Sequence, residues 1–559
     1  MRKNLILTLS AYSLFAILTS CSKMGALSAD NFTVTPNPLE TQGGKISATI
    51  DGRFPEKYMK KKAVVTVIPE LRYGNGQVVR GEGATFQGEK VKGNDQTISY
   101  KLGGKYNMKT AFTYVPEMQK SDMYLSFDAH IGRKKVNIPS VQVATGVIAT
   151  SELYKRTLMS DGGCMAPDSF ERVKAQKQEA NIRFLINQAN LRKSELKNNS
   201  VTEFVRLLKK INQDRKGLNI RNVEVQAYAS PEGGFALNDK LANKRQNTSE
   251  GYVKQQLKQT GVSTDIDAHY TAQDWDGFQK LVQASNIQDK DVILRVLSMY
   301  KDPQEREQQI RNMSAGFREL ANGILPELRR SRLIINYETV GRSDEEIKSQ
   351  YDTDASKLSV EELLYLATLQ DDMAKKEEIY KKTTEFYGKD YRAYNNLAAL
   401  EMIKGDEAAA KRFLSQALNA DENAPEVYAN QGLLSLEDGN LQRAENEMAK
   451  ATGANNFGQA LGALNIAKGN YAEAEENLKG INSNTAALAQ ILNKNYAAAA
   501  STLDAIKNPT GLTDYLHAIV AARRGNKFAA ESYLAEAVKK DPSLQAYADN
   551  DLELAIVKK

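Results

Sequence analysis

The chain has 559 residues, which is too long for one hydrophobic core and predicts about three or four domains. Its 75 basic and 69 acidic residues give a net charge of +6, and the two kinds are interleaved along the chain without a long basic block. Nucleic acid is therefore not an expected partner.

Residues 1–20 have the pattern of a secretion signal, with a basic start at Arg2 and Lys3 and an apolar run from Leu5 to Leu18. This run is shorter than the roughly 20 residues that a membrane-spanning helix needs. The segment Leu18-Thr-Ser-Cys21 resembles a bacterial lipobox, which implies that Cys21 becomes the lipidated first residue of the mature protein. A plain signal peptide or a short membrane anchor is the alternative.

Residues 21–31 are expected to form a lipidated tether. In the sorting scheme known for lipoproteins of this kind, an Asp directly after the cysteine retains the protein in the inner membrane. Ser22 stands there instead, and no acidic residue precedes Asp30 to route the chain to the cell surface. These features predict attachment to the outer membrane with the body of the protein in the periplasm.

Residues 32–145 are predicted to form an all-β sandwich of immunoglobulin-like type. Short segments rich in β-branched and aromatic residues alternate with glycine-rich turns, as in Ala63-Val-Val-Thr-Val-Ile68 and Gly74-Asn-Gly76. Several such strands at this spacing are typical of an antiparallel sandwich.

Residues 146–180 are expected to be a mixed connector that contains Cys164. With Cys21 lipidated, Cys164 has no partner for an internal disulfide. None of His130, His269 and His517 is near it in the sequence, so we expect a passive thiol in a loop or half-buried site and not a nucleophile.

The next strand, 223–228, leads into a segment with a recognisable spacing. Gly233 is followed by Asn238, Leu241 and Arg245, in the pattern Asn-x-x-Leu-x-x-x-Arg. This spacing resembles the peptidoglycan-binding signature of OmpA-like domains, in which a strand ends in Thr-Asp and a glycine follows three residues later. The aspartate of the family falls on Ser230 in this chain.

The resemblance implies a ligand site for the cell-wall peptide. In the family, the aspartate pairs with the ammonium of diaminopimelate, whereas a guanidinium such as that of Arg245 can hold a carboxylate through two parallel hydrogen bonds. Because Ser230 replaces the aspartate, Glu232 is the candidate to take over the ammonium. A turn at 231–233 that projects Glu232 into water is the alternative.

The resemblance extends over residues 181–340 and implies an α+β domain. Its opening strand is expected at 181–187, a helix carries Phe204, Leu208 and Ile211 on one face, and the closing strand is expected at 332–337. A helical insertion is predicted at about 275–326, and a polar, acidic linker at 341–357.

Residues 358–559 are predicted to form a helical solenoid. Tyr394 and Tyr428, and likewise Gly405 and Gly439, are separated by 34 positions, as are several small alanines. This period resembles that of tetratricopeptide repeats, and five or six helix pairs are expected. Such an array leaves a concave surface suited to a peptide or a helix, with Asn395, Asn396 and Asn430 as candidate groove residues; solvation on the helix surface is the alternative.

No metal-ligand spacing, phosphate loop or nucleophile arrangement is found, so neither an enzyme nor a cofactor is expected. The leading hypothesis is a periplasmic lipoprotein of the outer membrane that acts as a tether and scaffold. Its central domain would contact peptidoglycan, and its repeats would recruit proteins. The alternative is a subunit of an outer-membrane secretion or assembly machine whose central domain no longer binds peptidoglycan.

Overall fold

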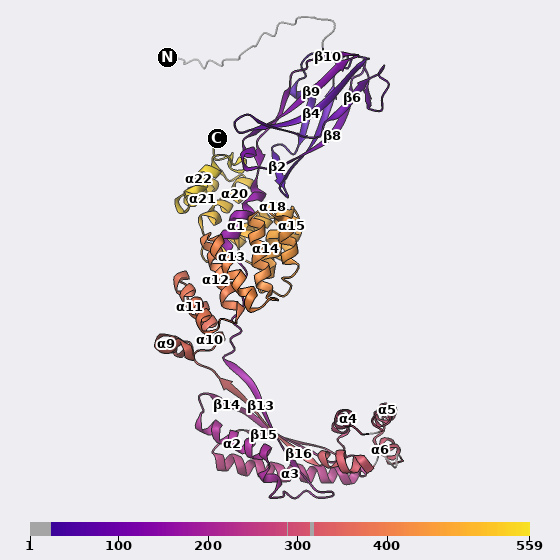
Figure 1. Cartoon of the computed structure of the whole chain (residues 1–559), viewed down its shortest axis with the longest axis vertical. Helices are drawn as coiled ribbons and strands as arrows, with labels where there is room; N and C mark the ends of the chain where they lie inside the picture. Colours follow the sequence, from indigo (N-terminus) through magenta and orange to yellow (C-terminus); the bar gives the residue numbers. More distant parts are fainter. Residues whose placement is uncertain (1–23, 288, 313–317, 559) are drawn as a thin grey trace, which may run out of the picture. The chain divides into compact units, whose positions relative to one another are not determined.

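The computed structural model describes residues 24–287, 289–312 and 318–558 (Figure 1). The predicted signal peptide and Cys21 lie outside this range. The chain forms two compact units, and the first is discontinuous: it combines the residues up to Asp168 with those from Leu363 onward. The second unit, Ser169–Glu362, is inserted between them. The N-terminal and C-terminal regions, which were expected to be separate domains, therefore belong to one unit, and the central region is inserted into it.

The N-terminal part of the first unit is rich in β-structure, as the sequence predicted. Two sheets pack face to face around one core. The first sheet contains β1 (Phe32–Thr35), β2 (Leu39–Gln42), β3 (Lys45–Phe54), β8 (Gly104–Thr113) and β12 (Val147–Ile148). The second contains β4 (Ala63–Tyr73), β5 (Gln77–Arg80), β6 (Ala84–Gly88), β7 (Gln96–Ile98), β9 (Ser121–Ile131), β10 (Lys134–Val136) and β11 (Val141–Thr145).

Alternation along the strands explains this core. In β3, Ile46, Ile50 and Phe54 are buried while their neighbours Lys45 and Arg53 face solvent. The core also takes in Met24 and Leu27, which precede β1. Part of the expected tether is thus packed into the folded domain.

The C-terminal part of the first unit is an array of antiparallel helix pairs. Glycine or asparagine ends the first helix of most pairs, as at Gly405 and Gly439, where the backbone adopts positive φ. The helices are α10 (Val360–Thr368), α11 (Met373–Phe386), α12 (Tyr391–Lys404), α13 (Glu407–Ala420), α14 (Pro425–Glu437), α15 (Leu441–Met448), α16 (Phe457–Lys468), α17 (Tyr471–Asn477), α18 (Asn484–Leu492), α19 (Tyr496–Asp504), α20 (Gly511–Arg523), α21 (Lys527–Lys540) and α22 (Ser543–Ala548).

Small residues let the paired helices approach closely. Ala410 and Ala444 occupy equivalent positions in α13 and α15 and are fully buried. Gly432 of α14 lies against Met448 so closely that an added Cβ would come within 2.6 Å of its Cγ. The middle helices are short, α17 having 7 residues, which accounts for the irregular spacing of the middle repeats in the sequence.

A segment from the connector crosses this array. It consists of a 3₁₀ turn, η3 (Thr150–Leu153), helix α1 (Tyr154–Asp161) and an extended stretch to Asp168, and we call these residues, 150–168, the strap. Helix α1 contacts α12, α14, α16, α18 and α20, the first helices of five successive pairs. Leu153, Tyr154 and Leu158 belong to the same hydrophobic core as the array.

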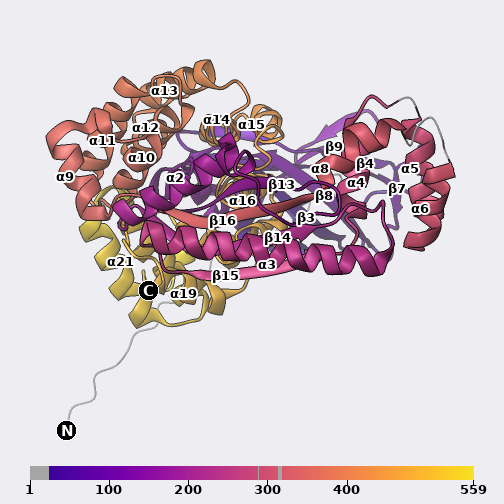
Figure 2. The same cartoon turned by 90° about the horizontal axis from the view of Figure 1, so that it is seen from below.

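The second unit is an α+β domain with a four-stranded sheet in the order β13-β16-β14-β15. Strands β13 (Val173–Arg183) and β16 (Arg330–Val340) are antiparallel, β14 (Leu218–Tyr228) is antiparallel to β16, and β15 (Asp265–Thr271) is parallel to β14. Helices α2 (Asn199–Gln213) and α3 (Phe235–Thr260) cover one face of this sheet (Figure 2).

Two segments of this unit differ from the sequence prediction. Strand β13 begins at Val173, eight residues before the expected start. Its first half is polar and exposed, so the sequence pattern did not indicate a strand, and pairing with β16 holds it in place. The expected linker contains helix α9 (Asp344–Asp354), which begins at a capping box formed by Ser343 and Glu346. The acidic residues that suggested a linker lie in the first turn of this helix, where they favour its formation.

The helical insertion has its own small core around Phe278, Val282 and Ile293. It consists of α4 (Trp275–Ala284), α5 (Lys290–Met299), α6 (Pro303–Asn312), a π-helical turn η5 (Leu320–Ile324) and α8 (Leu325–Leu328). Within the described ranges, no helix combines the length and the apolar character that crossing a bilayer requires.

One buried carboxylate makes the stability of the array depend on pH. Asp551 accepts hydrogen bonds from the Tyr515 hydroxyl at 2.6 Å and from the Glu553 amide at 2.9 Å. Burial raises the pKa of Asp551 from 3.8 to about 6. Between these two values the folded state binds more protons than the unfolded state, so the free energy of unfolding falls as the pH rises through this window.

We therefore expect Asp551→Asn, which keeps an acceptor oxygen without the charge, to raise the thermal unfolding midpoint of the array at neutral pH. The gain corresponds to at most about 3 kcal/mol and should vanish below the ordinary pKa of aspartate. Circular dichroism at both pH values, with the exposed Asp549→Asn as the control, measures it. An equal effect of Asp551→Asn at both pH values would contradict the assignment.

Candidate functional site

The three predicted groove asparagines lie together on the concave face of the array and are buried. Asn395 and Asn396 come from α12 and Asn430 from α14. Their side chains do not face solvent, because the extended end of the strap lies on them. The segment that covers the three asparagines is part of the same chain.

The asparagines bind the strap through its backbone. Asn430 accepts a hydrogen bond from the Cys164 amide at 2.6 Å and donates to the Cys164 carbonyl at 3.0 Å. Asn396 makes the same pair of bonds with Ala166, at 2.7 and 3.1 Å. Asn395 donates a further bond to the Cys164 carbonyl at 2.8 Å. A carboxamide carries both a donor and an acceptor, so it can satisfy the N–H and the C=O of one residue in an extended chain.

The remaining length of the strap is also held by hydrogen bonds. The Asp161 carboxylate accepts from the Thr485 amide and hydroxyl, both at 2.7 Å, at the start of α18. Thr150 donates to Glu553 at 2.6 Å near the C-terminus of the chain, and Arg392 of α12 donates to the Asp168 carbonyl at 3.0 Å. The strap thus runs antiparallel to the array over its whole length from α12 onward.

Two consecutive glycines allow this close approach. A Cβ atom on Gly163 would lie 2.4 Å from the Asn430 Oδ1 atom, and Gly162 has a φ of 72° and lies against Ile403. Any larger residue at position 163 would push the strap off the asparagines.

Cys164 follows directly and is buried against the array, where burial raises the pKa of its thiol to about 12. The thiol is thus covered, and its pKa lies well above neutral pH.

In the second unit, the OmpA-like signature forms a compact turn between β14 and α3. The Asn238 amide group donates to the Ser230 carbonyl at 2.9 Å and to the Gly233 carbonyl at 2.8 Å, and the Ser230 hydroxyl donates to Glu232 at 2.9 Å. Leu241 is half-buried on the next turn of α3. The structure therefore brings the predicted residues together, with their polar groups bonded to one another.

Arg245 is fully buried, with 0% of its surface exposed. Its guanidinium donates to the carbonyls of Gln188 at 3.0 Å, Tyr228 at 2.8 Å and Leu185 at 3.3 Å. The Phe184 ring lies 5.0 Å away from it. Burial, together with the neighbouring Arg329, lowers the pKa of Arg245 to about 10, so the side chain still carries its charge at neutral pH.

Glu232 is paired with Arg329, at 2.8 and 3.0 Å from its two carboxylate oxygens. Both side chains are largely buried. Glu232 is thus neither projected into water nor open to an ammonium ligand. The sequence contained one signal for this partner, the basic pair Arg329-Arg330 in front of the closing strand.

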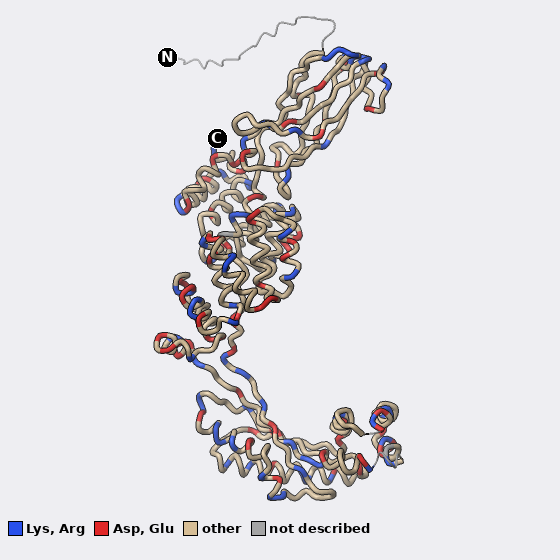
Figure 3. Tube along the Cα trace, in the orientation of Figure 1, with Lys and Arg blue, Asp and Glu red and all other residues tan. Residues whose placement is uncertain are grey.

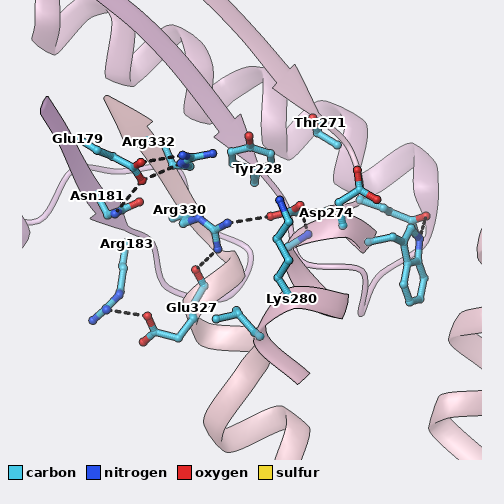
Figure 4. A pocket seen from close by; sticks show the side chains of 15 residues that line it. Glu179, Asn181, Arg183, Tyr228, Thr271, Asp274, Lys280, Glu327, Arg330 and Arg332 are labelled. Atoms are coloured by element: carbon cyan, nitrogen blue, oxygen red, sulfur yellow. Dashed lines mark hydrogen bonds and ion pairs between the residues drawn. The ribbon is translucent and has the colours of Figure 1, made fainter. Parts of the chain in front are cut away.

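The face of the sheet opposite α2 and α3 borders an open cavity of about 650 Å³ (Figure 4). Its charged residues are mostly paired: Arg332 with Glu179 at 2.7 Å, Arg330 with Asp274 at 3.1 Å, and Arg183 with Glu327 at 2.6 Å. The bond from Arg332 lowers the pKa of Glu179, whereas burial raises that of Asp274. Because cations and carboxylates balance, the cavity favours neither an anionic nor a cationic ligand.

Among residues 24–287, 289–312 and 318–558, no group of three or more His, Cys, Asp or Glu side chains could hold a metal ion.

No protein-family model matches this chain, and no curated protein matches it. Solved structures are similar at low sequence identity. A tetratricopeptide repeat protein from Parabacteroides merdae is 17% identical, with 39% of this chain and 91% of that chain covered and a TM-score of 0.28. PilF of Pseudomonas aeruginosa is 16% identical, with 37% and 98% covered and a TM-score of 0.26. Yeast Tom70 is 10% identical, with 63% and 78% covered and a TM-score of 0.24.

These scores are too low to carry an argument about function. The description of the C-terminal region as a helical repeat array rests on its own helix pairs and on the spacing of 34 residues between equivalent positions.

We expect Asn430→Ala to weaken the hold on the strap, because it leaves the amide and the carbonyl of Cys164 without this partner. Two lost hydrogen bonds amount to about 2 kcal/mol, or roughly 30-fold in the opening equilibrium. In the full mature chain with Cys21→Ala, Cys164 is the single thiol, so its rate of labelling by a maleimide measures this opening.

The matched control is Asn446→Ala on the exposed side of α15, which should leave the labelling rate at the wild-type value. Rapid labelling of the wild-type thiol, or equal rates for both variants, would show that the strap does not rest on Asn430.

Proposed function

We propose that this protein is a periplasm-facing lipoprotein of the outer membrane that acts as a non-catalytic scaffold for other proteins. The observation that carries the proposal is the helical array, whose inner face is filled by the strap while the second helices of its pairs keep an exposed side. The lipobox-like sequence before Cys21 and the OmpA-like spacing at 233–245 support the compartment.

Partners are expected on the outer surface of the array, because the inner face is occupied. Phe528 of α21 is 83% exposed, and Phe386 of α11 is also exposed. We expect a partner to cover these side chains, because removing apolar surface from water favours association.

Arg245 and Glu232 bond to other groups of the same domain, which favours an assembly or scaffold subunit whose OmpA-like domain does not bind the cell wall. A guanidinium can grip a carboxylate only if it has donors in reach of the ligand, and that of Arg245 is buried among backbone carbonyls. The second candidate is a peptidoglycan tether, which is favoured by Gly233, Asn238, Leu241 and Arg245 in the family spacing.

Co-sedimentation with purified peptidoglycan sacculi separates the two. We expect the mature chain with Cys21→Ala to stay in the supernatant. Ser230→Asp should stay there as well, since position 230 is buried beside the paired Glu232 and a new carboxylate there would meet a like charge.

A peptidoglycan-binding OmpA-like domain serves as the positive control for this assay. Glu232→Gln keeps the shape of the turn. If the wild-type chain pellets and this variant does not, the central domain is a wall tether, which would contradict its assignment as a scaffold.

The membrane anchor is tested separately. We expect the wild-type protein to fractionate with the outer membrane and Cys21→Ser to be released as a soluble periplasmic protein, because acyl chains supply the anchoring. Mass spectrometry of the N-terminal peptide identifies the lipid. Recovery of the wild type in the inner membrane, or of Cys21→Ser in the outer membrane, would contradict the assignment.

A further inference from the structure

One end of the β-sandwich is strongly basic (Figure 3). Four loops meet there, at residues 55–62, 89–95, 99–103 and 132–135, and we call them the basic end. Backbone hydrogen bonds join them: the Lys90 amide donates to the Lys61 carbonyl, the Gly132 amide to that of Lys62, and the Lys57 amide to that of Tyr100. The loops are therefore neighbours and form one surface.

This surface carries ten basic residues against three acidic ones. The basic residues are Lys57, Lys60, Lys61, Lys62, Lys90, Lys92, Lys101, Arg133, Lys134 and Lys135. Among the residues that the structure describes, one of the ten forms an ion pair: Lys135 lies 3.5 Å from the exposed Asp128. The surface therefore keeps a large excess of positive charge.

An exposed apolar side chain lies within this ring of cations. Leu102, at the tip of the turn between β7 and β8, is 76% exposed. Its neighbour Lys101 is exposed as well, and Lys60 lies over the ring of Tyr100 at 5.3 Å. An apolar tip surrounded by lysines fits the boundary between lipid headgroups and acyl chains, where the charge meets phosphate and the apolar group is buried.

The chain enters the domain at this same end. Met24 and Leu27 are buried in the core of the sandwich, and the Tyr58 hydroxyl, from the first of the four loops, donates to the Gly25 carbonyl at 2.8 Å. Cys21 is three residues before Met24, and three residues span at most about 11 Å. An acyl chain on Cys21 would therefore hold the basic end within about one Debye length of the lipid surface.

The opposite end of the sandwich contacts the helical array. Gln42, the last residue of β2, donates to the Gly469 carbonyl at 3.0 Å, and Tyr471 donates to the Thr41 carbonyl at 3.4 Å. The array thus lies on the side of the sandwich away from the basic end, and no described residue of the array covers these lysines.

We propose that the basic end is a docking surface for an anionic phospholipid bilayer, with Leu102 inserted among the headgroups. The location of this surface at the membrane rests on the proposed lipidation of Cys21. Its affinity for anionic lipid does not, because the lysines and Leu102 belong to the folded domain. Docking fixes the orientation of the sandwich, which an acyl anchor alone leaves free to rotate.

The test uses the full mature chain with Cys21→Ala, which has no acyl group, in co-sedimentation with lipid vesicles. We expect binding to vesicles of phosphatidylcholine mixed with phosphatidylglycerol, little binding to phosphatidylcholine alone, and loss of binding at high salt. Each cation near an anionic surface strengthens binding roughly fivefold, so Lys61→Gln, Lys62→Gln and Lys134→Gln together should weaken it about 100-fold. Leu102→Asp should weaken it as well.

The matched control replaces three exposed lysines of the inserted unit, Lys193, Lys209 and Lys240, by glutamine and should bind like the wild type. Equal loss in the two triple variants, or equal binding to neutral and anionic vesicles, overturns the proposal. So does binding of the lysines to sacculi in place of vesicles, because the surface would then belong to the wall polymer. Lack of vesicle binding would not change the fractionation expected for Cys21→Ser, so the docking proposal and the lipid-anchor proposal are tested separately.

Discussion

The first unit depends on the hydrogen bonds between asparagine carboxamides and the backbone of the strap. Asn430 and Asn396 each bond the N–H and the C=O of one residue, and Asn395 adds a bond to the Cys164 carbonyl. A buried peptide group without a partner would be costly, so these side chains decide whether an extended segment can lie inside the array. The strap in turn supplies Leu153, Tyr154 and Leu158 to the core, and the concave face is part of the interior of the protein.

In the inserted unit, polar side chains likewise bond to groups of the chain itself. Asn238 satisfies two carbonyls of its own turn, Arg245 three carbonyls from neighbouring strands and loops, and Glu232 is paired with Arg329. In both units, residues that are typical of ligand sites bind the chain itself. What remains for outside partners is exposed surface: the outer helices of the array and the basic end of the sandwich.

The sequence predicted what depends on local pattern. The alternation in β3, the helix ends at Gly405 and Gly439 and the buried alanines follow from the nearest neighbours of each residue, and they appear as expected. The strap could not be predicted, because helix α1 has only 8 residues and its partners, such as Asn430 and Thr485, lie hundreds of positions away. The first half of β13 was not predicted for the same reason, because its residues are polar and form a strand only through pairing with β16. At the signature, spacing located the turn but gave no indication of the burial of Arg245.

The strap also has a consequence for folding during synthesis. It is synthesised before the inserted unit and long before the array, so Tyr154 and Leu158 leave the ribosome with no groove to enter. The contact between Thr150 and Glu553 forms only after 403 further residues have been added. Pairings so distant in the chain are slow to form, and apolar segments that wait for them are prone to aggregate. The apolar side chains of the strap therefore stay exposed on the nascent chain until the helices of the array have been synthesised.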